Sequence, residues 1–98
     1  EQYMYRKKRF FIAYDITKDK LRSKIQKKLE NYGFRIQYSN YLCHFFAKDL
    51  RTVKNYCEKI IEKDDSIVWI PISDQLLNLI TYQGKIINFL RKPEPKIY

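Results

Sequence analysis

Asp15 is the acidic residue whose position best suits chemistry. It ends the apolar run of residues 10–14, which is typical of a buried strand, and a helical pattern follows at once. Only Asp19 lies near it in sequence, so one chain is poor in acids for a metal site. Mg²⁺ needs one or two carboxylates, however, and in a two-fold dimer the Asp15 side chains of both copies could meet at the axis. The alternative is that both aspartates complement the partial positive charge of the helix N-terminus.

Basic residues are concentrated near the N-terminus of a strongly positive chain. The formal net charge is +9, and residues 1–28 hold ten basic and three acidic residues. A one-sided basic patch on a compact domain favours a nucleic-acid partner, so we expect phosphate contacts at residues 6–9 and on the first predicted helix. The alternative is an ordinary solvated helix face. The helix residues expected to contact nucleic acid are Lys20, Arg22, Lys24 and Lys28.

Other chemistries find little support in the residue types. His44 is the only histidine, which excludes a two-histidine acid–base pair within one chain. Cys43 and Cys57 have neither zinc spacing nor a disulfide framework. No Gly-rich phosphate loop, nucleophile elbow or RNP1 strand is present. The apolar runs are too short to span a membrane and no secretory signal is recognisable, so we expect a reducing, cytoplasmic location.

The hydrophobic pattern predicts one domain over residues 1–98, made of short strands and two amphipathic helices. Thr17 is expected to cap the first helix, and Gly33 to end it in a left-handed conformation. Ser39 and Asn40 are expected to form a tight turn between two strands. The predicted helices are residues 18–32 and 48–63, and the predicted strands are residues 9–15, two within 34–46, 67–72, 79–83 and 86–90.

This order of elements predicts a ferredoxin-like α+β sandwich (βαββαβ), with two helices on one face of an antiparallel sheet and an extra C-terminal strand. The first strand is apolar on both faces. A second copy of the sheet is the simplest cover for the face that the helices leave free, so we expect a symmetric homodimer. The core spans about residues 9–84, between a basic extension at residues 1–8 and a C-terminal strand or tail at residues 85–98.

Four segments of the chain carry a recognisable pattern. They are FIAYDITKDKLRSKI at residues 11–25, Leu-x-x-Tyr-Gly at residues 29–33, RIQYS at residues 35–39 and DSIVWIPI at residues 65–72. In this order they resemble the second core CRISPR-associated (Cas) protein family, small ferredoxin-like proteins that act with the Cas integrase in spacer acquisition. Four segments in register over one small domain make the resemblance fairly specific.

The resemblance implies a homodimer whose sheets pack together, with the final strand crossing to the partner's sheet. It also implies a metal-dependent phosphodiesterase activity, assigned to some members, on single-stranded RNA or double-stranded DNA. Asp15 occupies the family's metal-binding position, so Mg²⁺ would be shared between the Asp15 residues of two subunits. Arg35 is also expected to contact nucleic acid. The other positions that match family motifs are Tyr14, Arg22, Arg35, Gln37 and Ser39.

The chain departs from the family pattern after Ser39. The family usually reads VFEG there, and this chain reads NYLC at residues 40–43. The acid and the glycine are both absent, which removes support for catalytic help from that strand.

The leading hypothesis is a dimeric protein of CRISPR spacer acquisition that binds duplex DNA and bridges dimers of the Cas integrase. Mg²⁺-dependent phosphodiester hydrolysis, as an endoribonuclease or endodeoxyribonuclease, is the enzymatic form of this hypothesis. The alternatives are a structural nucleic-acid-binding adaptor without nuclease activity and a ribonuclease toxin of the virulence-associated type.

Overall fold

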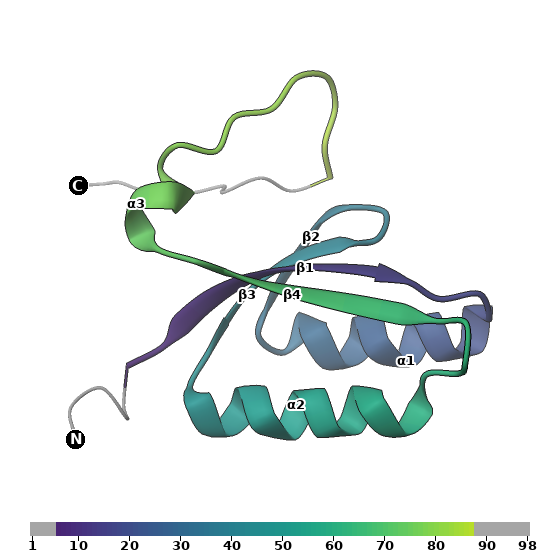
Figure 1. Cartoon of the computed structure of the whole chain (residues 1–98). Coiled ribbons are helices and arrows are strands. Elements are labelled where there is room, and N and C mark those ends of the chain that lie inside the picture. Colours follow the sequence, from purple (N-terminus) through teal and green to yellow (C-terminus); the bar gives the residue numbers. More distant parts are fainter. Residues whose placement is uncertain (1–5, 88–98) are drawn as a thin grey trace.

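The structure is a computed structural model and describes residues 6–87. Its elements are β1 (Lys8–Asp15), α1 (Asp19–Glu30), β2 (Gly33–Gln37), β3 (Asn40–Phe45), α2 (Ala47–Ile60), β4 (Ser66–Ile72) and α3 (Asp74–Leu77). Figure 1 shows the sheet above α1 and α2, which lie side by side. No helix in this range is long and apolar enough to cross a membrane.

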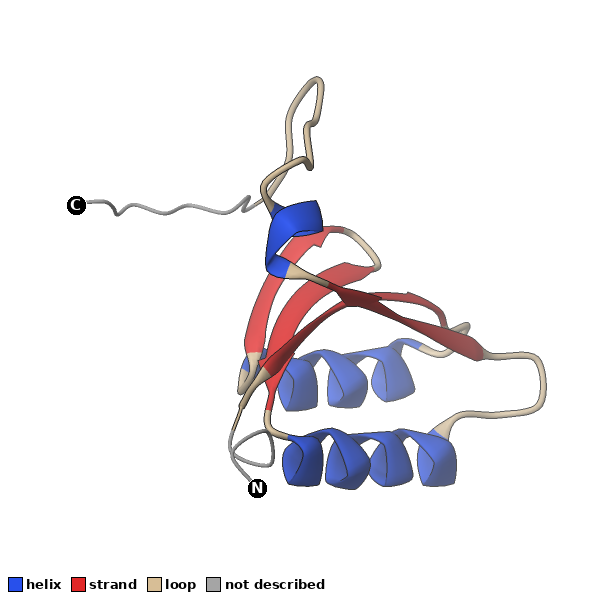
Figure 2. Cartoon of the chain, turned by 60° about the vertical axis from the view of Figure 1, so that its left-hand side comes forward, coloured by secondary structure: helices blue, strands red, loops and turns tan. Residues whose placement is uncertain are grey.

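β1 lies inside a four-stranded antiparallel sheet with the order β2-β3-β1-β4. Phe10 of β1 pairs with Cys43 of β3 on one side and with Pro71 of β4 on the other. Because β4 is an edge strand, the missing N–H of Pro71 is tolerated there, as predicted. Both long helices cover the same face of the sheet (Figure 2), which confirms the predicted ferredoxin-like α+β fold.

The hydrophobic core lies between the sheet and the two long helices. Alternate residues of β1 and β3 enter it from the sheet, and residues four apart enter it from α1 and from α2, as the two periodicities require. The buried residues of this core are Phe10, Ile12, Tyr14, Ile16, Ile25, Leu29, Tyr41, Cys43, Phe45, Val53 and Cys57.

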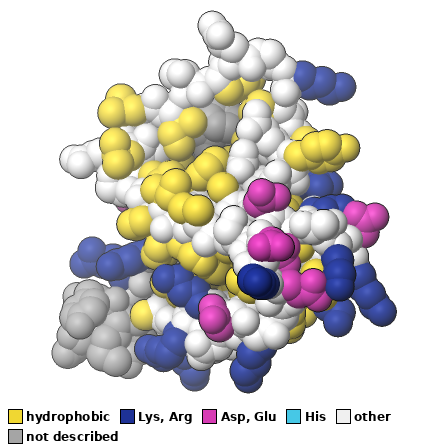
Figure 3. Space-filling model, turned by 45° about the vertical axis from the view of Figure 1, so that its right-hand side comes forward, with side chains coloured by type: hydrophobic (Ala, Val, Ile, Leu, Met, Phe, Trp, Pro, Cys, Tyr) yellow, Lys and Arg dark blue, Asp and Glu magenta, His cyan; other side chains and the backbone are white. Residues whose placement is uncertain are grey.

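The opposite face of the sheet is also apolar. Phe34, Leu42, Phe11 and Ile70 are register partners in a row that crosses all four strands. On β4, Val68 is 51% exposed and Ile70 is 44% exposed. Hydrophobic side chains gather across the middle of the molecule in Figure 3. An exposed apolar group of this kind is typical of an interaction surface.

Gly33 has a different role from the one predicted, and its expected left-handed conformation is wrong. α1 ends at Glu30 with Asn31 in a right-handed conformation, and Gly33 is the first residue of β2. A Cβ atom at Gly33 would lie 2.0 Å from the carbonyl oxygen of Leu42 and 2.6 Å from Cα of Cys43. The glycine is therefore required by the close approach of β2 to β3.

Three predicted boundaries also shift. Lys18, not Thr17, occupies the N-cap of α1, and no side chain caps the helix there. The turn between β2 and β3 is formed by Tyr38 and Ser39, one residue earlier than expected. α2 ends at Ile60, earlier than predicted, because Ile61 already has an extended backbone.

The chain after β4 differs most from the prediction. Ser73 caps the short helix α3 by accepting a 3.1 Å hydrogen bond from the backbone N–H of Leu76, where only a polar break was predicted. The predicted strand at residues 79–83 is wrong, because their backbone groups pair with no strand in the described part of the chain. Of the predicted strand at residues 86–90, residues 88–90 lie outside the described residues. The Ile87 N–H donates a 2.8 Å hydrogen bond to the Ile36 carbonyl of β2.

Candidate functional site

Asp15 lies at the carboxyl end of β1, opposite Ser66 of β4, and its side chain is exposed. Because side chains alternate along a strand, Asp15 shares its face with Phe11 and Ala13, opposite the face that enters the helix-packed core. Within residues 6–87 its carboxylate has no hydrogen-bond or ion-pair partner. Asp15 is therefore available to a ligand.

A cleft of about 620 Å³ opens beside Asp15, where β1 meets α1 and the turn between β2 and β3. This volume lies within the range of small-ligand sites. Five of the residues singled out from the sequence line it, namely Tyr14, Asp15, Arg22, Arg35 and Ser39. The lining residues that sequence reasoning did not single out as site residues are Ile16, Asp19, Ser23, Gln26 and Tyr38.

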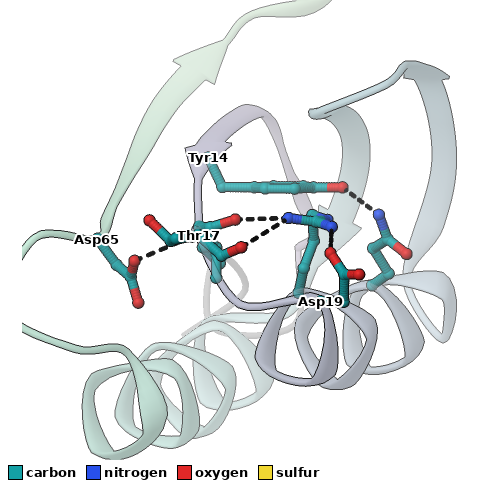
Figure 4. Close-up of polar contacts among 7 residues, drawn as sticks. Tyr14, Thr17, Asp19 and Asp65 are labelled. Atoms are coloured by element: carbon teal, nitrogen blue, oxygen red, sulfur yellow. Dashed lines mark hydrogen bonds and ion pairs between the residues drawn. The ribbon is translucent and has the colours of Figure 1, made fainter.

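Arg22 holds the loop that follows Asp15. Its Nη1 donates to the carbonyl oxygen of Ile16 at 2.6 Å and, more weakly, to that of Thr17 at 3.5 Å. Its Nη2 pairs with the Asp19 carboxylate (Figure 4). These contacts occupy most of the guanidinium and neutralise Asp19. Arg22 thus acts mainly on the shape of the cleft, and Asp19 is not a free metal ligand.

Asp65 fastens the same loop from the other side. One carboxylate oxygen accepts the Thr17 N–H at 3.2 Å, as Figure 4 shows, and the other accepts the Glu62 N–H at 2.8 Å. A 3.1 Å ion pair between Lys18 and Glu62 adds to this contact. The role of Asp65 could not be expected from the sequence, because nothing in the local pattern links it to a residue 48 positions away.

Tyr14 connects the floor of the cleft to its rim. Its hydroxyl donates a 3.1 Å hydrogen bond to the carbonyl oxygen of Tyr38 and accepts a 2.8 Å bond from Nε2 of Gln26. The Tyr14 backbone N–H donates to the Ser39 carbonyl at 3.0 Å. The family position of Tyr14 therefore has a structural use in this chain.

The remaining predicted residues divide between the cleft and the outer surface. Arg35 lines the cleft, and its one hydrogen bond in the described chain, to the Tyr38 carbonyl, is long at 3.5 Å. Gln37 lies outside the cleft and accepts a 2.9 Å hydrogen bond from Asn40. Ser39 contributes to the lining at the turn.

The lysines of α1, unlike Arg22, lie outside the cleft. Lys20 and Lys24 are exposed and have no ion-pair partner among residues 6–87. The ammonium group of Lys28 lies 4.5 Å from the ring centroid of Tyr56 on α2. Of the α1 lysines predicted to contact nucleic acid, Lys20 and Lys24 are therefore freer to meet phosphates than Lys28.

Two cations of the N-terminal basic segment already have partners. Arg9 forms an ion pair with Asp74 of α3. The ammonium group of Lys7 lies 5.1 Å from the ring centroid of Phe46. Contacts by these residues to phosphate would have to compete with contacts inside the chain.

Histidine and cysteine chemistry has no support at this site. Burial and the nearby Arg9 and Lys7 cations lower the pKa of His44, so its imidazole is neutral at pH 7. Burial raises the pKa of Cys43 to about 12 and that of Cys57 to about 11, which keeps both thiols protonated. None of these residues lines the cleft beside Asp15.

Comparisons with solved structures support the fold. The hypothetical protein TT1823 from Thermus thermophilus superposes with a TM-score of 0.72 at 24% identity, covering 84% of this chain and 96% of that one. Streptococcus pyogenes Cas2 superposes with a TM-score of 0.71 at 21% identity, covering 78% of this chain and 99% of that one. At these identities the likeness concerns the fold alone.

Comparisons of sequence show the family as well as the fold. A curated relative from Synechocystis sp. (strain ATCC 27184 / PCC 6803 / Kazusa), named CRISPR-associated endoribonuclease Cas2 3, is 32% identical over 77 residues. These cover 78% of this chain and 84% of the relative. A protein of the same name from Chloroflexus aurantiacus is 39% identical over 57 residues, covering 57% of this chain and 61% of that one. The family model described as CRISPR associated protein Cas2 matches residues 8–78. The chain therefore belongs to the Cas2 family of CRISPR-associated proteins.

Proposed function

We propose that this chain is a dimeric CRISPR-associated protein of spacer acquisition that binds duplex DNA, joins the Cas integrase and hydrolyses phosphodiester bonds. Membership of the Cas2 family supports the CRISPR context. The relatives from Synechocystis and Chloroflexus aurantiacus are named endoribonucleases, which supports hydrolysis of a nucleic acid. The net charge of +9 supports binding to a polyanion. The acquisition role and the integrase partner rest on the family resemblance.

The free carboxylate of Asp15 is the observation that carries the catalytic part of the proposal. A structural carboxylate is normally satisfied by N–H donors, as Asp65 is by Thr17 and Glu62. Asp15 has no such partner within the described chain, yet it lines a cleft together with Arg22 and Arg35. An unpaired carboxylate beside cationic groups suits a site for a metal ion and a phosphate.

The helix-free face of the sheet supports the dimer. Asp15 lies on this face, close to its half-exposed residues, since Val68 pairs with Ala13 two positions before Asp15. A second copy that packs on this apolar face would bring the two Asp15 residues toward a common two-fold axis. The same packing would remove Val68 and Ile70 from water, which stabilises the dimer by the hydrophobic effect.

The donor chemistry fits Mg²⁺ only when two copies are counted. No group of three or more His, Cys, Asp or Glu residues gathers within residues 6–87. One or two carboxylates suffice for Mg²⁺, because water and phosphate oxygens complete its shell, so Asp15 of both copies would hold the ion. When bound, Mg²⁺ neutralises charge on the phosphate and lowers the pKa of a coordinated water.

The side chains of this chain would position the phosphodiester for hydrolysis. Arg35 makes only one long hydrogen bond within the described residues, so its other N–H donors can take phosphate oxygens. In the reaction a water oxygen attacks phosphorus, the bond from phosphorus to one sugar oxygen breaks, and that sugar oxygen leaves as a hydroxyl with a proton from the water. Arg22 keeps the loop after Asp15 in place during this step.

Cleavage of labelled RNA and duplex DNA tests the catalytic role of Asp15. With Mg²⁺ at neutral pH we expect wild type to cleave one of them, and Asp15→Asn to lose at least about a hundredfold in rate, because a bound metal contributes several kcal/mol to the barrier. Asp49→Asn makes the same change in the first turn of α2, outside the cleft, and should leave the rate unchanged. Equal rates for Asp15→Asn and wild type would contradict the role of Asp15. Duplex binding without cleavage by wild type would point to the adaptor alternative.

The molar mass in solution tests the dimer. Ile70→Asp places a charge on the apolar face and should give a monomer, since burying an unpaired charge is costly. Asn55→Asp adds the same charge on the exposed side of α2 and should remain dimeric. A dimeric Ile70→Asp protein would show that the subunits meet elsewhere.

A further inference from the structure

Tyr38 presents its ring to solvent more fully than any other large hydrophobic side chain in the described chain, at 81% exposed. It lies in the turn between β2 and β3, at the rim of the cleft that contains Asp15. An aromatic ring so exposed contributes little to the core, and its face is accessible to a partner from outside.

The backbone that carries this ring is held firmly. The Tyr38 carbonyl accepts hydrogen bonds from the Tyr14 hydroxyl at 3.1 Å and from Arg35 at 3.5 Å. Gln26 fixes the Tyr14 hydroxyl in turn at 2.8 Å. The next residue, Ser39, accepts the Tyr14 N–H at 3.0 Å. A ring on a fixed backbone loses little conformational freedom when it binds a flat partner.

Tyr38 also lies between two hollows. On one side is the cleft of about 620 Å³ with Asp15, Arg22 and Arg35. On the other side is a hollow of about 250 Å³, which Tyr38 lines together with Ile36, Gln37, Lys85, Ile86 and Ile87. Cationic side chains therefore stand on both sides of an exposed aromatic ring. Basic groups that alternate with an aromatic ring are the pattern by which proteins hold single-stranded nucleic acid.

We propose that Tyr38 is a base-stacking residue and that the ligand of this rim is an unpaired stretch of nucleic acid. One base stacks on the Tyr38 ring, and the phosphates on either side approach Arg35 and Lys85. A base inside a duplex is already stacked on both faces, so a duplex gains nothing from Tyr38. The inference rests on the proposed function, and it makes Tyr38 the residue that selects unpaired strands next to Asp15.

Fluorescence of a 2-aminopurine oligonucleotide of about ten nucleotides tests stacking directly, because a site of roughly this size fits single-strand binders. Binding is measured in EDTA, so that no cleavage occurs, with the oligonucleotide either single or fully paired. Stacking is worth about 1–3 kcal/mol per base, so Tyr38→Ala should weaken single-strand binding about fivefold or more and abolish the quenching. Tyr38→Phe keeps the ring and should bind within about twofold of wild type. Duplex binding should be unchanged in both variants.

Tyr82→Ala is the matched control, because it removes another exposed aromatic side chain that lines neither hollow. Single-strand binding and quenching in Tyr38→Ala equal to those of wild type would overturn the inference, while duplex binding and Asp15-dependent cleavage would still support the proposed function. A loss in Tyr38→Phe as large as in Tyr38→Ala would also overturn it, since the hydroxyl and not the ring would then make the contact. Wild type that binds neither form would contradict the proposed function together with the inference.

Discussion

The hydroxyl of Tyr14 donates a 3.1 Å hydrogen bond to the main-chain oxygen of Tyr38. The bond ties the end of β1, where Asp15 lies, to the turn that presents the Tyr38 ring. Tyr14 itself is buried, and the hydrogen bond to the exposed turn is partly buried. The position of the cleft rim relative to Asp15 therefore depends in part on the Tyr14 side chain, beside the backbone bond from Tyr14 to Ser39.

Tyr14→Phe should destabilise the protein by about 1–3 kcal/mol. The change removes two hydrogen bonds, one to Tyr38 and one from Gln26, each worth about 0.5–1.5 kcal/mol. Chemical denaturation gives the free energy of unfolding. Tyr32→Phe is the control, because within the described residues the Tyr32 hydroxyl makes no hydrogen bond while its ring packs on Phe45. Similar losses of unfolding free energy in both variants would show that the hydrogen bonds of the Tyr14 hydroxyl contribute little to stability.

The lysines of α1 should govern the salt dependence of duplex binding. Replacing Lys20, Lys24 and Lys28 by Ala should flatten the slope of log K against log salt by about 0.9 for each phosphate that is no longer neutralised. Lys28 lies over Tyr56, so most of the effect should come from the other two. Lys48 and Lys59 on α2 provide a control pair, whose replacement should leave the slope as it is. An unchanged slope in the α1 variant would place the DNA on another surface.

Gly33→Ala should cost at least about 2 kcal/mol of stability. Its new methyl group would overlap the backbone of Leu42 and Cys43, which cannot rotate away as a side chain can. Gly84→Ala is the comparison, because Gly84 has a φ of +79° but open space around it. That variant should lose about 1 kcal/mol through backbone strain alone. Thermal unfolding ranks the two, and a larger loss at Gly84 would refute the close approach of β2 to β3.

His44 should make the protein less stable in mild acid. Burial and the neighbouring Arg9 and Lys7 cations lower its pKa in the folded state, and the opposing effect of Asp74 is smaller. The unfolded chain then binds the proton more tightly, so stability present above about pH 6.5 is lost as the pH falls below that value. Melting temperatures at about pH 7.5 and pH 5.5 measure the loss.

His44→Gln isolates this effect, because the chain has no other histidine. The variant should show a smaller drop in melting temperature between the two pH values. An equal drop in variant and wild type would assign the acid sensitivity to carboxylates.

The fold could be predicted wherever the hydrophobic pattern is local. The apolar run before Asp15 predicted an interior strand, and the spacing of Ile25 and Leu29 predicted the buried side of α1. The position of Asp15 at a strand end followed from the same pattern. The chain after β4 was mispredicted because an apolar segment such as residues 79–83 becomes a strand only where another strand offers backbone partners.

Much of the candidate site depends on contacts between distant segments. The conformation predicted for Gly33 was wrong, because a glycine is required there by the close approach of Leu42 on the neighbouring strand, which leaves no room for a Cβ atom. Arg22 was expected to meet phosphate, yet its guanidinium turns back onto the Ile16 carbonyl. The local sequence did not mark Tyr38 as a site residue, since its exposure and its hydrogen bond with Tyr14 exist only in the folded chain.

The stoichiometry of Mg²⁺ binding tests the central claim most directly, namely that Asp15 of two copies shares one ion. Calorimetric titration of the wild-type dimer should give one bound ion for every two chains. Asp15→Asn, and Ile70→Asp as a monomer, should bind none at that site. The first change removes the carboxylate ligands, and the second removes the partner subunit that supplies one of them. One ion per chain in wild type, or unchanged binding by Asp15→Asn, would contradict the shared site.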